Sequence, residues 1–467
     1  MQKTYKKVDG SDLVFFQQLL ESWQVLSLND DLVKYSRDHT EDLQFFPELV
    51  LLPTNPQQIA SILRYCNEHQ IPVTARGAGT GLSGGALPVH QGIILSTEKL
   101  NRILKVDTEN FQAILEPGVI NEELQQEVSK YGLFYPPDPA SKGSCFMGGN
   151  VSHASGGPRA LKYGTTRDYI LNLEVVLADG SVIWTGANTL KYSTGYNLTH
   201  LMIGSEGTLG IITKIVVRLI PAPTKNQLLL ALFSDPVKAC ESVARVFMAG
   251  CHPSVFEFIE PEGFRLSSAY CNLSFDIPSD AGAYLLIEVD GHDEQLLQKE
   301  CEQISEVLYQ LNCIDILHAS STEQKEFFWK LRRTIGEATK SGNVYKEEDT
   351  VVPRFQLPEL FLGVKSIAQK YHLRTVCYGH AGDGNLHVNI LKDDHSDVYW
   401  NGEVKEAIRE IFLLCHTLNG TISGEHGIGY VQKEFMPLVL SETNLSLMKG
   451  IKNVFDPHGI LNPGKIF

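Results

Sequence analysis

A glycine-rich stretch constrains the fold of this chain more than any other segment. Residues 74–88 read TARGAGTGLSGGALP, and six of the nine positions in 77–85 are glycine or alanine. Such a backbone lets a ligand approach closely, and its successive amide groups can point at phosphate oxygens. Arg76 can add positive charge, and Thr80 can add a hydroxyl donor. The stretch therefore predicts a loop that holds the phosphates of a nucleotide cofactor.

The same stretch contains a literal GxGxxG at positions 79–84, the pattern of nicotinamide-binding Rossmann folds. That fingerprint requires a helix directly after the glycines, but Pro88 and a β-rich run follow here. A Walker P-loop has less support still, because no Gly-Lys-Ser/Thr follows. The Rossmann fold and a purely structural glycine turn stay open as alternatives to a diphosphate cradle of another kind.

Further glycine- and proline-rich segments follow the first one. They are 136–141 (PPDPAS), 148–151 (GGNV), 155–157 (SGG) and 204–212 (GSEGTLGII). Each signal is weak alone, but so much flexible backbone is costly unless a ligand covers it. Together the segments predict a long dinucleotide cofactor.

Length and charge narrow the class of protein. The 467 residues correspond to about three ordinary domains or to two large ones. The chain has 40 basic and 55 acidic residues, a formal net charge of −15, which argues against nucleic acid as a partner. No apolar run approaches the roughly 20 residues of a membrane span, and no signal core follows the N-terminus. The nine cysteines are scattered without a CxxC pair, so we expect a protein of the reducing cytoplasm.

The pattern of elements predicts two domains. We expect a helix that begins at Asn55-Pro56, a short helix capped by Asn121, and strands at 71–74, 91–96, 112–116, 170–178, 181–184 and 209–219. Pro221-Ala222-Pro223-Thr224 predicts a boundary. Strands at 227–233 and 283–290 alternate with helices at 236–249 and 293–312 and predict a second α+β domain. A last helix at 443–454 begins a tail that can fold back onto the first domain.

Two histidines and a glutamate are candidates for a metal site. A strand at 373–378 leads to His380, and after a tight glycine turn the next strand has His387, Asn389 and Leu391 on one face. Glu425 lies in a second glycine-lined bend. Two imidazoles and one carboxylate leave a coordination position open, as catalytic metal sites do. The alternative is two core histidines and an unrelated acid.

A metal with an open position could bind an α-hydroxy acid and lower the pKa of its hydroxyl group. His426, next to Glu425, is the candidate base, because imidazole titrates near neutral pH. Arg332 could bind the substrate carboxylate with two hydrogen bonds, and Lys346 is a second candidate cation. Either cation could equally be a solvated surface charge.

Jointly, eight stretches resemble the FAD-linked D-2-hydroxy acid dehydrogenases. That family includes D-lactate dehydrogenases, the FAD subunit of glycolate oxidase and D-2-hydroxyglutarate dehydrogenase. The stretches are ARGAGTGLSGGALP (75–88), PPDPAS (136–141), GGNVS (148–152), GSEGTLGIIT (204–213), YKEEDTVVP (345–353), GHAGDGNLH (379–387), SGEHGIG (423–429) and FDPHGILNPGKIF (455–467).

The resemblance implies an α+β fold: a vanillyl-alcohol-oxidase or PCMH-type FAD-binding domain with an α+β cap domain for substrate and metal. The implied ranges are 1–222 for the FAD domain, 223–439 for the cap, and 440–467 for a segment that returns to the FAD domain. FAD would be non-covalent, because no histidine lies between Thr74 and Leu87.

The resemblance also implies roles for single residues. The FAD-binding positions are Arg76, Gly77, Ala78, Gly79, Thr80, Gly81, Leu82, Gly85, Pro139, Ser141, Gly149, Asn150, Gly210, Ile211 and Asn462. The metal ligands are His380, His387 and Glu425, with zinc favoured over manganese, cobalt or iron. His426 is the base, and Arg332, Lys346 and Asn389 are the substrate contacts.

The implied reaction moves the hydroxyl proton to His426 and a hydride to flavin N5. Electrons then pass to a separate acceptor, which could be a quinone, a cytochrome, an electron-transferring flavoprotein or a partner subunit. Gly336, one turn after Arg332, offers no polar group for a second carboxylate, which favours D-lactate or glycolate. A D-2-hydroxyglutarate dehydrogenase, a non-catalytic flavoprotein subunit and a metallohydrolase are the alternatives. A homodimer and a peripheral place at the inner face of the membrane stay open.

Overall fold

The computed structural model describes residues 4–41 and 43–467, which form two compact units. The first unit holds the described part of Met1–Gly156 together with Gly164–Ala222 and Glu425–Phe467. The second unit holds Gly157–Tyr163 and Pro223–Gly424. The chain thus returns to the first unit at Glu425, ahead of the expected position 440. The reason is that the stretch after Glu425 is hydrogen-bonded to the glycine-rich loop of the first unit.

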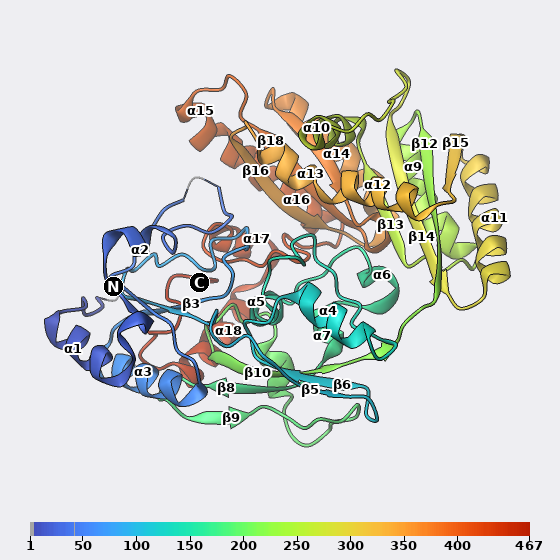
Figure 1. Ribbon diagram of the computed structural model, residues 1–467. Helices are drawn as coiled ribbons and strands as arrows, with labels where there is room; N and C mark the ends of the chain where they lie inside the picture. The colour runs from blue at the N-terminus through green and yellow to red at the C-terminus, as the bar shows by residue number, and fades with distance from the viewer. Residues whose placement is uncertain (1–3, 42) are drawn as a thin grey trace. The chain divides into compact units, whose positions relative to one another are not determined.

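Two larger sheets build the first unit (Figure 1). A four-stranded sheet has the order β1-β2-β4-β3, and a five-stranded antiparallel sheet has the order β5-β6-β10-β8-β9. The strands are β1 (Val25–Leu26), β2 (Leu49–Leu51), β3 (Val73–Arg76), β4 (Ile93–Ser96), β5 (Ile103–Asp107), β6 (Gln112–Leu115), β8 (Ile170–Val176), β9 (Val182–Trp184) and β10 (Ile211–Arg218), with β7 (Leu133–Phe134) and β11 (Ile220–Pro221) pairing separately.

The helices of the first unit follow from local signals. Asn55 caps α3 by accepting from the Gln58 amide, and Pro56 occupies the first turn, as expected. The prediction for Asn121 is wrong, because Asn121 is the first helical residue and Ile120 takes the cap position. The helices are α1 (Gly10–Leu19), α2 (Asn29–Val33), α3 (Pro56–His69), α4 (Asn121–Ser129), α5 (Met147–His153), α7 (Thr166–Tyr169), α8 (Leu198–Met202), α17 (Met436–Val439) and α18 (Glu442–Phe455).

The C-terminal tail is part of the first unit's core. Leu461 forms a parallel bridge with Val73 on β3, and the Asn462 amide donates to the Val73 carbonyl. Ile460 and Leu461 are buried among the side chains of β2, β3, β4 and α3. The last residues therefore lie beside the strand that leads into the glycine-rich loop.

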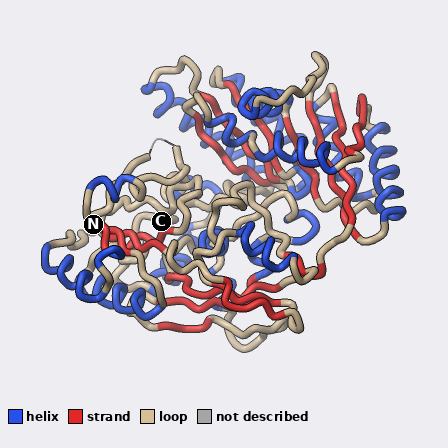
Figure 2. The backbone as a smooth tube through the Cα atoms, viewed as in Figure 1, coloured by secondary structure: helices blue, strands red, loops and turns tan. Residues whose placement is uncertain are grey.

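A seven-stranded antiparallel sheet forms the second unit, in the order β15-β12-β14-β13-β17-β18-β16 (Figure 2). Helices α9, α11, α14 and α16 pack against the sheet and one another, and α10, α12 and α13 form a second group. The strands are β12 (Lys225–Phe233), β13 (Val255–Ile259), β14 (Ala283–Gly291), β15 (Cys313–Ala319), β16 (Tyr345–Val351), β17 (Arg374–Gly379) and β18 (Asn385–Leu391). The helices are α6 (Ala160–Tyr163), α9 (Pro236–Met248), α10 (Pro261–Cys271), α11 (Glu294–Gln310), α12 (Thr322–Arg333), α13 (Ile335–Lys340), α14 (Leu357–Lys370), α15 (Asp397–Asn401) and α16 (Glu403–Thr417).

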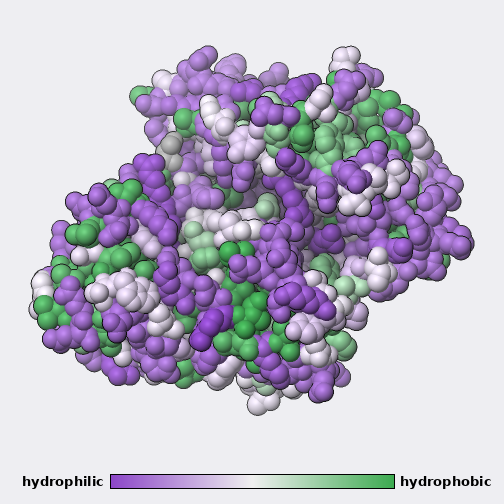
Figure 3. Space-filling view, in the orientation of Figure 1, coloured by the Kyte–Doolittle hydropathy of each residue, from purple (hydrophilic) through white to green (hydrophobic). Residues whose placement is uncertain are grey.

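Hydrophilic side chains cover much of the viewed surface of each unit in Figure 3. Within the described residues, no helix has the length and apolar character needed to cross a membrane.

Candidate functional site

The glycine-rich loop leaves β3 and has a row of unused amide groups. Among the described residues, the backbone amides of 77–83 donate to no acceptor. Gly79 and Gly84 have φ values of +76° and +72°, which favour glycine. The next regular element is β4 rather than a helix, which excludes the Rossmann alternative. Partly buried amides are normally paired, so this row fits the phosphates of a bound dinucleotide.

The Arg76 side chain packs against the backbone of this loop at Gly79. Its guanidinium lies where a Cβ on Gly79 would be, and its Nη2 donates to the Arg37 carbonyl over 2.8 Å. The side chain is buried and lies over the ring of Tyr35. The Arg76 side chain, which was expected to add charge near a phosphate, therefore stabilises the conformation of the loop.

The other glycine-rich segments meet the loop within the first unit. Asn462 donates to the carbonyls of Gly85, at 2.9 Å, and Glu206, at 2.7 Å. A Cβ on Gly77 would lie 3.9 Å from the Gly149 backbone, and a Cβ on Gly149 would meet nothing within 4 Å. Four segments far apart in sequence thus converge, with open space beside Gly149 where a cofactor could approach.

Two buried asparagines, Asn121 and Asn150, connect the segment 136–141 with the segment 148–151. Asn150 donates to the Asn121 side chain over 3.1 Å, and Asn121 donates to the Pro137 carbonyl over 3.1 Å. Pro139 and Ser141 follow in a turn that Ser141 closes by accepting from the Cys145 amide. Asn121 therefore does not serve as a helix cap. Its side chain instead fixes the expected FAD-binding segments 136–141 and 148–151 relative to each other.

Gly210 and Ile211 lie against the five-stranded sheet. A Cβ on Gly210 would come within 2.4 Å of the Val175 side chain, and Ile211 is buried in the core as the first residue of β10. Both residues pack within the first unit, and their part in FAD binding stays a prediction.

The segment that carries Glu425 and His426 is attached to the glycine-rich loop. Tyr430 donates its amide to the Ser83 carbonyl over 2.7 Å, and the Ser83 hydroxyl donates to the His426 carbonyl. The Glu425 carboxylate lies 2.7 Å from where a Cβ on Gly156 would be. The Nε2 of His426 and a Glu425 oxygen are 3.9 Å apart. The candidate base and the candidate third ligand therefore lie beside the expected FAD cradle.

In the second unit, strand pairing gathers polar side chains on one sheet face. Glu347 pairs with Asn389, and Asp349 pairs with His387. Partners in an antiparallel pair point to the same side, and alternate residues share a face. Asp349, His387 and Asn389 are buried there. The hairpin and the shared face of His387 and Asn389 that the sequence predicted are confirmed.

Glu257 on β13 joins two of the candidate residues. Its Oε1 lies 2.7 Å from Nδ1 of His380, and its Oε2 forms an ion pair with Nη2 of Arg332. Glu257 is fully buried, and Arg332 is 5% exposed. Burial acts to raise the pKa of Glu257, but Arg332 and His380 outweigh it and the pKa lies below its usual value. The Nε of Arg332 is buried and has no acceptor among the described residues.

The two histidine rings face a common region of the second unit. Their centroids are 5.3 Å apart and their planes are nearly perpendicular, at 86°. A nitrogen of His380 and a nitrogen of His387 lie within 4.8 Å of each other. Glu257 lies at hydrogen-bond distance, 2.7 Å, from Nδ1 of His380, and the Asp349 carboxylate lies farther, 3.6 Å, from Nδ1 of His387. A carboxylate at Nδ1 is the usual outer partner of a metal-binding imidazole, so these two residues fit a metal ion.

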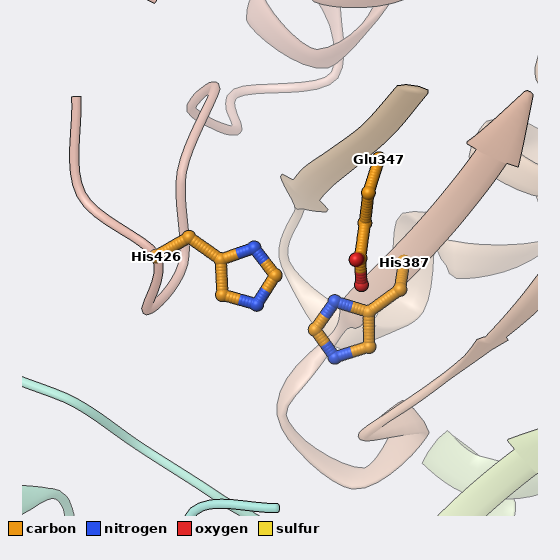
Figure 4. Close-up of side chains that lie close together, drawn as sticks. All are labelled: Glu347, His387 and His426. Atoms are coloured by element: carbon orange, nitrogen blue, oxygen red, sulfur yellow. The ribbon is translucent and has the colours of Figure 1, made fainter. Parts of the chain in front are cut away.

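Glu347 is a polar neighbour that no pattern in the sequence singles out. Its side chain and that of His387 point toward each other from β16 and β18 (Figure 4), with ligand atoms within 4.8 Å. The third side chain drawn there, His426, belongs to the first unit. The Tyr378 hydroxyl donates to Glu347 over 3.3 Å, and Lys340 lies 3.7 Å from the same carboxylate.

Lys346 does not join this group. It pairs with Ile390 on the opposite face of the sheet, and its Nζ lies 5.6 Å from the ring centroid of Trp400. Lys346 thus lies on the face opposite His387, because a shift of one residue along a strand reverses the face, and its contact with substrate stays a prediction. Glu347, the next residue along the strand, lies on the same face as His387.

The second unit also places Gly336 beside the candidate site. A Cβ on Gly336 would lie 3.2 Å from the Tyr378 hydroxyl. The pKa of Tyr378 is raised well above its usual value by burial and by Glu347. The position one turn after Arg332 is therefore faced by a neutral phenol.

Comparisons with known families agree with this arrangement. Residues 47–186 match the family of FAD binding domains, and residues 222–466 match the C-terminal domain of FAD linked oxidases. The chain belongs to the FAD-linked oxidase family. It is accordingly an FAD-dependent oxidoreductase of the D-lactate, glycolate or 2-hydroxyglutarate dehydrogenase type.

Relatives match over nearly the whole chain. The glycolate oxidase subunit GlcD of Bacillus subtilis (strain 168) is 38% identical over 93% of this chain and 92% of its own. The D-lactate dehydrogenase of Anaerostipes hadrus is 38% identical over 90% and 89%. The D-2-hydroxyglutarate dehydrogenase of Stutzerimonas stutzeri (strain A1501) is 31% identical over 96% and 97%.

Solved structures confirm the fold. p-Cresol methylhydroxylase with bound substrate superposes with a TM-score of 0.78 over 97% of this chain and 96% of its own, at 19% identity. Alkyldihydroxyacetonephosphate synthase gives 0.77 over 99% and 86%, at 16% identity. The expected α+β fold of PCMH type is therefore confirmed.

Proposed function

We propose that this family member oxidises a small D-2-hydroxy monocarboxylic acid, such as D-lactate or glycolate, to the 2-oxo acid. The observation that carries the proposal is the group formed by Arg332, His380 and His387 in the second unit. It offers a cation for a carboxylate and two imidazoles for a metal ion that would take the adjacent hydroxyl.

Arg332 would bind the substrate carboxylate. Its buried Nε has no acceptor among the described residues, while Nη2 forms the ion pair with Glu257. A buried donor without a partner is costly, so a ligand oxygen there would be strongly favoured. Asn389, on the same face, would contact the substrate beside it.

His380 and His387 would hold a divalent metal, zinc first, with Glu425 as the third ligand. Such an ion, when bound, lowers the pKa of a coordinated hydroxyl group. Gly424 ends the second unit and donates its amide to the Asp349 carbonyl, so Glu425 follows an anchored residue in the chain.

His426 would take the hydroxyl proton. Its segment is attached to the loop whose free amides suit the FAD diphosphate. Non-covalent FAD, when bound, supplies a hydride acceptor at N5 of the flavin. The electrons would go on to a separate acceptor: a quinone, a cytochrome, an electron-transferring flavoprotein or a partner subunit. The nine unpaired cysteines support a cytoplasmic setting.

Gly336 supports a monocarboxylate, because it brings no polar side chain toward the neutral Tyr378 hydroxyl. The competing substrate is D-2-hydroxyglutarate, as in the Stutzerimonas relative. Steady-state oxidation of D-lactate, glycolate and D-2-hydroxyglutarate with an artificial electron acceptor tests the proposal. A higher kcat/KM for the dicarboxylate would contradict it.

The proposed base, His426, and the proposed carboxylate-binding residue, Arg332, have separate tests. His426→Ala should keep bound FAD but abolish its reduction by substrate. Arg332→Met should mainly raise KM for the acid. Normal flavin reduction in the first variant, or unchanged kinetics in the second, would remove that residue from the proposed site.

A further inference from the structure

Glu257 is a carboxylate in the middle of a strand that is otherwise apolar. The residues of β13 are Val255, Phe256, Glu257, Phe258 and Ile259, and all five are buried. A buried carboxylate is costly unless its oxygens are matched by donors or cations. Here each oxygen has one such partner, His380 on Oε1 and Arg332 on Oε2.

We propose that Glu257 is the positioning residue that fixes both anchors of the substrate site, the metal ligand His380 and the carboxylate clamp Arg332. The inference rests on the proposed function. Glu257 itself touches neither metal nor substrate, and it acts through the two groups that do.

For His380, the contact determines which ring nitrogen carries the lone pair that can bind a metal. An ionised carboxylate only accepts hydrogen bonds, so Nδ1 carries the hydrogen in the 2.7 Å contact. In a neutral imidazole the other nitrogen, Nε2, then has the free electron pair. The hydrogen bond also fixes the ring plane and makes the imidazole a stronger ligand.

For Arg332, the same carboxylate selects one edge of the guanidinium. The ion pair engages Nη2 and leaves the buried Nε without an acceptor among the described residues. The guanidinium also lies over the Tyr378 ring, 4.9 Å from its centroid. A side chain held at two places keeps its Nε donor in one direction.

The spacing of the two anchors matters for a 2-hydroxy acid. The hydroxyl and carboxylate of such a substrate are on adjacent carbons. The metal and the Arg332 guanidinium must therefore stay at a fixed distance from each other. A single carboxylate that binds both groups fixes that separation. Small displacements of such groups lower rates strongly, because the reacting atoms must be aligned.

The test compares Glu257→Gln with Glu288→Gln in FAD-loaded full-length protein from which metal has been removed. Glu288 is a matched control: it is a buried glutamate on the same sheet face, and it pairs with Arg159 and the Trp329 indole. Calorimetric titration with Zn²⁺ alone measures metal affinity without reference to activity. We expect Glu257→Gln to weaken Zn²⁺ binding by about 10- to 100-fold, as loss of such partners usually does.

Kinetics separate the two anchors. Glu257→Gln should weaken Zn²⁺ binding and also raise KM for the hydroxy acid, whereas Arg332→Met should raise KM alone. Glu288→Gln should do neither. Unchanged Zn²⁺ affinity in Glu257→Gln, or an equal loss in Glu288→Gln, would overturn the inference.

A second variant covers the case in which Glu257→Gln does not fold because Arg332 is left unpaired. In Glu257→Gln/Arg332→Met both charges are absent, and Zn²⁺ binding should still be weaker than in Arg332→Met alone. Equal affinity of these two proteins would overturn the role at His380. Failure of the wild-type protein to bind Zn²⁺ or oxidise any 2-hydroxy acid would instead overturn the proposed function, and this inference with it.

Discussion

Oε2 of Glu206 lies 2.7 Å from the amide nitrogen of Gly429 and accepts its hydrogen bond. The other oxygen accepts from the Ile428 amide over 2.8 Å. Gly427, between these amides and His426, has a φ of +80°, and a Cβ there would lie 2.8 Å from Glu206. One carboxylate thus holds the turn that directly follows the proposed base.

Glu206→Gln should therefore slow flavin reduction by substrate at least tenfold while bound FAD is retained. The amide replaces one acceptor by a donor that faces an N–H group, at a cost of about 1–3 kcal/mol. Stopped-flow reduction and the flavin content of the purified protein measure the two quantities. Reduction at the wild-type rate would show that Glu206 is not needed to hold His426.

Lys465 predicts a pH dependence of stability. Burial lowers the pKa of this lysine to about 7, and its Nζ donates to the Leu87 carbonyl and to Asn462. Between pH 7 and the usual lysine range, the unfolded chain binds a proton that the folded protein does not. The lysine's contribution to the free energy of unfolding therefore rises with pH, by at most about 1.4 kcal/mol per unit.

Chemical denaturation of the wild type and of Lys465→Met at pH 7 and at pH 8.5 isolates this effect. Methionine does not titrate, so the wild type should gain stability relative to the variant as the pH rises. A constant or falling difference between the two proteins would contradict the assignment.

Lys346 and Glu347 provide a paired test of the strand register. Lys346→Ala should leave kcat/KM for the hydroxy acid within about threefold, because the side chain lies on the opposite face from His387. Glu347→Gln should change kcat/KM by more than tenfold, since Glu347 faces His387 and Tyr378. The reverse ranking of the two variants would mean that the register has been misassigned.

Asn462 joins the C-terminal tail to the cofactor loop. Asn462→Ala leaves the carbonyls of Gly85 and Glu206 without their donor in a buried place. Unpaired buried acceptors cost about 1–3 kcal/mol each, and the loop should lose its shape for FAD. We expect FAD affinity to fall about tenfold or more, measured by fluorescence during titration of the apoprotein. Wild-type affinity would show that the tail does not support the cradle.

The sequence predicted the features that depend on neighbours along the chain. The strand before the glycine-rich loop, the helix that begins at Pro56 and the hairpin between His380 and His387 all follow from local signals. The poor helix start at Pro88 was enough to disfavour a Rossmann fold, and the structure excludes it.

Features that depend on distant contacts were missed. The order of the seven-stranded sheet, in which β16 lies beside β18, cannot be derived from any local pattern. Without that register, Lys346 could not be distinguished from Glu347 as the residue on the functional face. Glu257 did carry a signal, a lone acid within the apolar run of β13, but its partners come from α12 and the residue after β17.

Anaerobic reduction of the bound flavin tests the central claim most directly. FAD- and metal-loaded protein is mixed separately with D-lactate, L-lactate, glycolate and D-2-hydroxyglutarate, and the flavin absorbance is followed without any other acceptor. We predict fast bleaching by D-lactate or glycolate, slow bleaching by D-2-hydroxyglutarate, and loss of the fast reaction when a chelator removes the metal. A flavin that none of the four acids reduces, or that D-2-hydroxyglutarate reduces fastest, would contradict the proposed function.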